Sequence, residues 1–538
     1  MAEVRWFAAA VASAVAVLVP SAVLVPSAVV SSASGVPASV ASTSASSSVP
    51  VSASSVVRTL AGAVRGSVRE GYRVFEGVPY AAAPVGALRW APPRPAAPWR
   101  GVRAATRPAS ACAQPAGEVP GGSISEDCLY LNVTAPSDAT PSRPRPVVVW
   151  LHGGGFTSGA GSSYDAHRMA VRGDVVVVTV NYRLGALGFL GRAGLPGSGT
   201  FGLADQQAAL RYVQRNIGAF GGDGQNVTLA GESAGAYAVC AQLASPSAAG
   251  LFQRAIMESG PCTGGPARPF APYAVDPSSA ETAGAKLAGA VGCARRADVL
   301  GCLRRVPTAR LLAAQGADAQ PEYGTALLPR DPAEAVASGR VARVPVLMGA
   351  NHDEGTIWAA GIMAAGTSVT PANWPAVVGE FVPDPARAAE VVAAYPVHGT
   401  DGGPVFGAVI GDADYACPAL RTGSLLAARQ PVWRYEFADP DPPRPTPAPP
   451  PFPLGATHTT ELPYLFDLGG RTRDMTEGQH RLADTMIGYW TRFARTGDPG
   501  GPGAPRWTRA QVQGLAPDRT GPVRPGGVHH CGLWATMP

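Results

Sequence analysis

From about residue 56 onward, short β-branched runs alternate with longer alanine-rich segments. Four runs predict buried strands, at 146–151, 174–180, 225–230 and 344–349, and the segments 237–243 and 479–492 have the composition of helices. Continuous apolar strands separated by helical segments are typical of a mostly parallel sheet covered on both faces, so the pattern predicts an α/β fold. No repeat of 20–50 residues interrupts it, which favours one large domain with insertions. In such sheets ligands bind beyond the carboxyl ends of the strands.

The first 55 residues follow a different pattern. Arg5 precedes an apolar stretch at 7–30, and a run rich in Ser, Ala and Val continues to about residue 55. This predicts a signal peptide over 1–33, a flexible segment over 34–55 and a folded domain over 56–538. The stretch is also long enough to be an uncleaved membrane anchor, but Pro20, Pro26 and the small-residue tail favour cleavage. We therefore expect a secreted, extracellular protein with no stable membrane partner unless this segment stays uncleaved.

Composition narrows the range of partners and cofactors. The formal net charge is only +5, and no block of five or more basic residues occurs, so nucleic acid is not an expected partner. No zinc-binding, EF-hand or phosphate-loop spacing is present, and the sequence therefore calls for neither a metal nor another cofactor. Eight cysteines in a chain of this length can close local loops but cannot form the main scaffold.

Two glycine-rich segments follow predicted strands. Gly231–Gly235, with the sequence GESAG, lies between the strand at 225–230 and the helix at 237–243. Small residues on both sides of a serine allow a sharp turn that presents Ser233 as a nucleophile. His152–Phe156, with the sequence HGGGF, follows the strand at 146–151. Consecutive glycines let backbone N–H groups point into a cavity, as an oxyanion hole requires.

A serine nucleophile needs a histidine base held by a carboxylate. Among the eight histidines, His458 is best placed, because it lies well after Ser233 in a polar loop that enters an apolar segment. For the acid, Asp353 and Glu354 both follow the strand at 344–349, and spacing alone does not separate them.

These motifs and several others resemble the type-B carboxylesterase/lipase family, which includes cholinesterases and bacterial esterases that cleave nitrobenzyl esters. The matching segments extend through almost the whole folded part, at 75–81, 84–90, 125–133, 152–156, 181–185, 205–206, 231–235, 252–260, 353–355, His458 and Glu461. The resemblance implies the α/β-hydrolase fold, with insertions that form a cap over the active site. It also implies that Ser233, Glu354 and His458 form the catalytic triad, and that the amides of Gly154, Gly155 and Ala234 form the oxyanion hole.

The resemblance also implies structural roles. It predicts the disulfides Cys112–Cys128 and Cys293–Cys302 and the ion pairs Arg89–Glu126 and Arg183–Asp205, and it suggests Glu232 and Ser259 as supports of the triad. We expect Cys240, on a predicted helix, to be a buried free thiol, and Cys262, Cys417 and Cys531 are left unassigned.

The expected activity is hydrolysis of small-molecule carboxylic esters through an acyl-enzyme. The loop between Cys112 and Cys128 is short and has no tryptophan, which disfavours a choline-ester specialist. A non-catalytic binding or adhesion member of the fold is the alternative of a different class, and a lipase or a transacylase is the alternative among enzymes.

Overall fold

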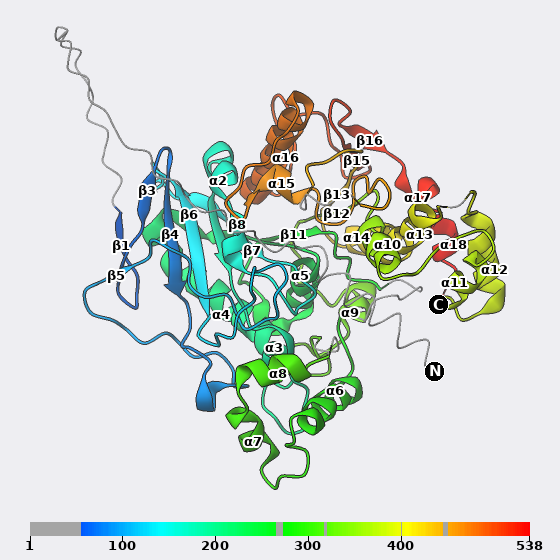
Figure 1. Ribbon diagram of the computed structural model, residues 1–538. Coiled ribbons are helices and arrows are strands. Elements are labelled where there is room, and N and C mark those ends of the chain that lie inside the picture. The colour runs from blue at the N-terminus through cyan, green and yellow to red at the C-terminus, as the bar shows by residue number, and fades with distance from the viewer. Residues whose placement is uncertain (1–54, 265–272, 317–319, 400, 445–449, 538) are drawn as a thin grey trace, which may run out of the picture.

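The structure is a computed structural model that describes residues 55–264, 273–316, 320–399, 401–444 and 450–537 (Figure 1). The predicted signal peptide, and the flexible segment up to residue 54, lie outside the described residues. Their boundaries therefore remain predictions. Among the described helices, none combines the length and the apolar character needed to cross a membrane.

An eleven-stranded sheet forms the centre of the molecule, in the order β16-β15-β13-β12-β11-β10-β7-β9-β6-β4-β3. Its central strands run parallel: β9 (Val176–Val180), β7 (Arg145–Leu151), β10 (Gly222–Glu232), β11 (Arg254–Glu258), β12 (Val346–Asn351), β13 (Val432–Phe437) and β15 (Val512–Leu515). Antiparallel strands complete both edges: β6 (Tyr130–Pro136), β4 (Tyr72–Pro79) and β3 (Ser67–Arg69) on one side, and β16 (Gly521–Val523) on the other. The predicted mostly parallel sheet is confirmed, and each of the four predicted strands overlaps a strand of its centre.

Helices cover both faces of the sheet (Figure 1). α4 (Phe201–Asn216) and α5 (Ala234–Ala244) pack on one face, and α2 (His167–Gly173) and α16 (Glu477–Thr496) pack on the other. In β7, Val147, Val149 and Leu151 belong to the apolar cluster under α4 and α5, whereas Val148 and Trp150 belong to the cluster under α16. Because successive side chains of a strand point to opposite faces, a continuous apolar run is what burial on both faces requires.

The register brings the carboxyl ends of four central strands together. Leu151 of β7 pairs with Gly231 of β10, Glu232 pairs with Glu258 of β11, and Glu258 pairs with Gly349 of β12. The segments after β7, β10 and β12 therefore leave the sheet at one edge. All three segments carry residues that the sequence predicts to belong to the active site.

Two helical insertions extend from the sheet (Figure 1). The first, between β11 and β12, contains α6 (Pro277–Ala290), α7 (Val299–Arg305) and α8 (Thr308–Ala314). The second, between β12 and β13, contains α10 (Thr356–Ala364), α11 (Trp374–Gly379), α12 (Pro385–Ala394), α13 (Gly403–Gly411), the π-helical turn η5 (Asp412–Ala416) and α14 (Cys417–Ala427). One buried apolar cluster lies mostly within the second insertion, and another joins the first insertion to Trp90 and Leu187. Because the insertions follow β11 and β12, they lie at the same end of the sheet as the predicted active-site residues.

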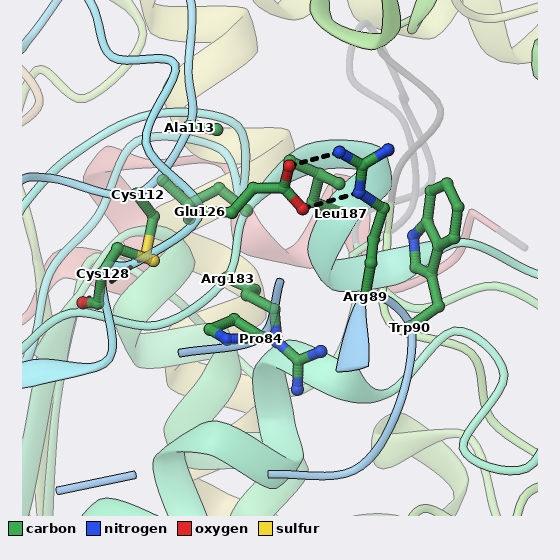
Figure 2. Close-up of a pocket in the computed structure, with 10 residues that line it drawn as sticks. Pro84, Arg89, Trp90, Cys112, Ala113, Glu126, Cys128, Arg183 and Leu187 are labelled. Atoms are coloured by element: carbon green, nitrogen blue, oxygen red, sulfur yellow. Dashed lines mark hydrogen bonds and ion pairs between the residues drawn. A yellow bond between two sulfur atoms is a disulfide. The ribbon is translucent and has the colours of Figure 1, made fainter. Parts of the chain in front are cut away.

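Two buried ion pairs hold loops near that end. Arg89 Nε lies 2.7 Å from Glu126 Oε2 (Figure 2). Arg89 Nη1 also donates to the carbonyl oxygen of Val306 at the end of α7. Arg183 Nη2 lies 2.7 Å from Asp205 Oδ1, and both side chains are buried. Both predicted ion pairs are confirmed. Since a buried charge without a partner is costly, we assign them to the scaffold.

The cysteines form four disulfides. The predicted pairs Cys112–Cys128 and Cys293–Cys302 are confirmed. The expectation of a free thiol at Cys240 is wrong, because Cys240 is bonded to Cys262. Cys262 follows β11, against which α5 packs, so the pairing depends on a helix–strand contact that spacing does not reveal. The remaining disulfide joins Cys417 to Cys531, at a sequence separation of 114.

Candidate active site

Ser233 occupies the turn between β10 and α5. Its backbone has φ 53° and ψ −123°, a conformation that a residue other than glycine rarely adopts. The flanking glycines make the turn possible, since a Cβ at Gly231 would lie 2.5 Å from the carbonyl carbon of Gly235, and one at Gly235 would lie 2.0 Å from the carbonyl oxygen of Leu151. The GESAG segment thus packs directly against the end of β7. The turn leaves the serine partly exposed at the carboxyl edge of the sheet.

His458 and Glu354 meet beside this turn. The Nδ1 atom of His458 lies 2.6 Å from Oε2 of Glu354, and both side chains are buried. The other carboxylate oxygen of Glu354 accepts a hydrogen bond from the amide of Asn351 at 2.8 Å. Asp353 instead accepts from the amide of Ala456 at 2.9 Å. The geometry therefore separates the two acids that spacing left open, and Glu354 is the one that contacts the imidazole.

The other nitrogen of His458 faces a different carboxyl group. Nε2 lies 3.3 Å from Oε1 of Glu232, the residue that precedes Ser233. Within the described residues, no hydrogen bond joins the Ser233 hydroxyl to His458. Hydrogen bonds of this kind are often long or misaligned without substrate and tighten in the Michaelis complex. The structure therefore joins the predicted acid and base and leaves the serine beside them.

Three more buried carboxyl groups surround the pair. Burial, reinforced by neighbouring carboxylates, raises the pKa of Glu232 and of Glu258 well above the usual value, and burial with Glu354 raises the pKa of Glu461 to about 7. Burial lowers the pKa of His458, but the charge and hydrogen bond of Glu354, together with the charges of Glu461 and Glu118, hold that pKa above its usual value.

The glycine segment after β7 provides free backbone donors. Gly154 and Gly155 have φ values of 102° and 60°, which favour glycine. In the part of the chain that the structure describes, their amides donate no hydrogen bond. Ala234 is the first residue of α5, where a helical amide has no acceptor within its helix. All three predicted oxyanion-hole residues are thus able to donate to a bound oxygen.

Some side chains at the site carried no signal in the sequence. Trp358 belongs to α10 and Tyr415 to η5, and their ring centroids lie 5.5 and 5.1 Å from the ring centroid of His458. Glu118, from the loop closed by Cys112–Cys128, is exposed to solvent and forms a side-chain hydrogen bond with Ser158. Its charge is among the influences that raise the pKa of His458. All three belong to loops or insertions, so only the tertiary fold brings them here.

Comparison with known proteins shows which family has this sequence and architecture. The family model described as the carboxylesterase family matches residues 53–516. The para-nitrobenzyl esterase of Bacillus subtilis (strain 168) is 35% identical over 480 residues, covering 82% of this chain and 90% of that protein. The acylcarnitine hydrolase of Mus musculus is 33% identical over 494 residues, covering 85% of each chain.

Solved structures agree with the sequence comparisons. A structure titled PNB esterase superposes with a TM-score of 0.73 at 32% identity, covering 88% of this chain and 99% of that one. A thermophilic PNB esterase superposes with a TM-score of 0.74 at 31% identity, covering 89% and 99%. By its sequence and its α/β-hydrolase fold, this chain belongs to the carboxylesterase family and is a serine hydrolase of carboxylic esters.

Proposed function

We propose that Ser233 is the nucleophile of this esterase, His458 its general base and Glu354 the carboxylate that orients the base. The observation that carries the assignment is the 2.6 Å contact between His458 Nδ1 and Glu354 Oε2, buried beside the strained turn at Ser233. A carboxylate in this position holds the imidazole in the tautomer with a lone pair on Nε2. It also stabilises the imidazolium that forms when the serine gives up its proton.

The reaction proceeds in two halves. Ser233 Oγ attacks the ester carbonyl carbon while His458 Nε2 takes the hydroxyl proton, and the carbonyl oxygen becomes an oxyanion. The amides of Gly154, Gly155 and Ala234 donate to that oxygen. When the tetrahedral intermediate collapses, the bond to the alkoxy group breaks and His458 protonates the departing alcohol. Water then attacks the acyl-enzyme by the same route and releases the acid.

We propose neutral acyl or aryl esters of small molecules as substrates. Trp358 and Tyr415 place apolar ring surface beside His458, and burial of such surface favours uncharged groups. The para-nitrobenzyl esterase named above is consistent with an aryl or benzyl alcohol moiety. We further propose that the protein acts as a secreted, extracellular enzyme. The four disulfides support this, since such bonds persist in oxidising compartments.

A series of p-nitrophenyl esters from C2 to C12 tests the proposal on the purified protein. We expect turnover with the wild type and loss of at least 10³-fold in kcat with S233A. S424A, which changes an exposed serine on α14, is the matched control and should retain wild-type kcat. Circular dichroism verifies that S233A is folded. Unchanged turnover in folded S233A would remove Ser233 from the mechanism.

The same series separates the alternatives. A non-catalytic binding or adhesion member of the fold would turn over none of the esters. A lipase would gain activity when long-chain esters form an interface, and a transacylase would form a new ester when an alcohol is supplied.

A further inference from the structure

Two histidines and two carboxylates outside the proposed triad meet where the C-terminal segment packs against the end of the sheet. His352 follows β12, Glu436 lies in β13, Asp412 begins η5 and His529 follows the short helix α17 (Pro525–Val528). The proposed hydrolysis uses none of them. We refer to His352, Glu436 and His529 as the His–Glu–His cluster, with Asp412 behind it.

The two imidazoles of the cluster converge on one carboxylate oxygen. His529 Nε2 lies 2.6 Å from Oε1 of Glu436, and His352 Nδ1 lies 3.2 Å from the same oxygen. One potential ligand atom from each residue lies within 4.8 Å of the other two. Two nitrogen donors and one carboxylate oxygen around a single point is the donor set of many zinc sites.

Asp412 holds His529 from behind. Its Oδ1 contacts Nδ1 of His529 at 2.5 Å, and its Oδ2 accepts a hydrogen bond from the Tyr395 hydroxyl at 2.7 Å. Trp534 Nε1 in turn donates to the Tyr395 oxygen at 2.8 Å. A carboxylate on the far nitrogen of a ligating histidine fixes its tautomer and directs the other nitrogen to a metal. This shell of hydrogen bonds therefore directs His529 Nε2 toward Glu436.

The cluster is open on one side. The side chains of His529 and Glu436 are 4% and 11% exposed, whereas that of His352 is 36% exposed. An ion can thus enter past His352, and water can occupy a fourth position on that side.

The geometry points to a site for one zinc-like divalent cation, held by His352 Nδ1, Glu436 Oε1 and His529 Nε2; this is our second proposal. Ligands about 2.0–2.1 Å from a tetrahedral ion are about 3.3 Å apart. The contact between His352 and Glu436 already has this length, and the one between His529 and Glu436 must open by about 0.7 Å. Imidazole nitrogens favour zinc, copper or nickel over calcium and magnesium, which prefer oxygen ligands.

An ion pair is the competing account of the same contacts. Although burial lowers the pKa of His529, its hydrogen bonds to Asp412 and Glu436 raise it to about 10. The metal-free ring is therefore a cation between two carboxylates. A bound metal would replace its Nε2 proton and keep the contact with Asp412.

A metal at this place would fasten the C-terminal segment rather than take part in hydrolysis. It would join that segment to β13 and to the loop after β12, and the disulfide Cys417–Cys531 already ties the same segment to α14. It would therefore act on stability, through residues separate from the proposed triad.

Zinc binding to the full, untagged and oxidised chain tests the proposal. After EDTA treatment and removal of the chelator, the protein is dialysed against ZnCl₂ and its zinc is measured by mass spectrometry, with Tm measured in parallel. We expect one zinc per chain and a higher Tm, with Co²⁺ giving tetrahedral absorption bands. H352Q should weaken zinc binding at least tenfold, since it removes one of three ligands.

The control is H480Q, which changes an exposed histidine on α16 and should bind zinc like the wild type. Because His352 is partly exposed, H352Q should fold even if H529Q does not. Less than a stoichiometric amount of zinc in the wild type, or equal binding in H352Q, would overturn the metal site and leave the cluster as an ion pair. Neither outcome bears on the ester-hydrolysis assignment.

Discussion

The contact between Glu354 and His458 can be tested by removing its charge and keeping its shape. In E354Q the side chain keeps its size, and its carbonyl oxygen can still accept from the amide of Asn351. At 2.6 Å and an effective dielectric constant of about 20, the lost attraction to an imidazolium is about 6 kcal/mol, or between 10⁴ and 10⁵ in rate. Both groups are buried, so solvent does little to reduce this figure. Replacing the acid of a Ser-His-Asp triad by its amide lowers kcat about 10⁴-fold. We therefore expect a loss of about 10⁴ in kcat.

The neighbouring acid supplies the control. Asp353 contacts the backbone of Ala456 rather than the imidazole. D353N should therefore lower the Tm and leave kcat close to the wild-type value. Both variants are assayed for kcat with p-nitrophenyl acetate, and circular dichroism verifies folding. Glu354 does not orient the base if folded E354Q retains more than a tenth of wild-type kcat, or if D353N loses as much kcat as E354Q.

The acid limb of the pH–rate profile should lie above pH 6.5, because the neutral form of His458 is the base and its pKa is raised. E118Q should move this limb to lower pH, because it removes a negative charge that raises the pKa of His458. An acid limb that stays in place would show that Glu118 does not influence His458. Opening the disulfide Cys417–Cys531 with paired serines should cost about 5 kcal/mol, from a closed loop with a sequence separation of 114, as measured by urea unfolding. A loss below about 1 kcal/mol would contradict this loop-closure argument. G235A places a methyl carbon 2.0 Å from a backbone carbonyl oxygen of β7, so soluble yield and kcat should both fall strongly. A soluble variant with wild-type kcat would contradict the close packing of the turn against β7.

Local sequence signals were sufficient where a structural demand falls on neighbouring residues. Apolar runs predicted the central strands β7, β9, β10 and β12, because burial on both faces leaves no polar alternation, whereas β11, β13 and β15 were not predicted. The GESAG segment predicted the turn at Ser233, because its glycines must pass within van der Waals distance of other backbone atoms. The outermost strands β3 and β16 have only three residues each and are largely exposed, so their pattern was too weak to identify them.

Long-range contacts set the limit of prediction. Local spacing did not separate Glu354 from Asp353, and only the family resemblance selected Glu354. The contact that distinguishes them joins Glu354 to His458, about a hundred residues away in sequence. The pairing of Cys240 was missed for the same reason. Trp358 entered the site through an insertion, and no local motif marks a side chain whose role depends on where a distant loop packs.

Covalent labelling identifies the nucleophile of this esterase. A fluorophosphonate reacts with an activated serine and stops at a stable adduct, so its position identifies the nucleophile. The protein is treated with one equivalent, its residual esterase activity is measured, and the labelled peptide is sequenced by mass spectrometry. We expect a single phosphonyl group on Ser233 and a loss of activity in proportion to labelling. Inactivation with the label on another residue, or full labelling of Ser233 with activity retained, would contradict the assignment of Ser233.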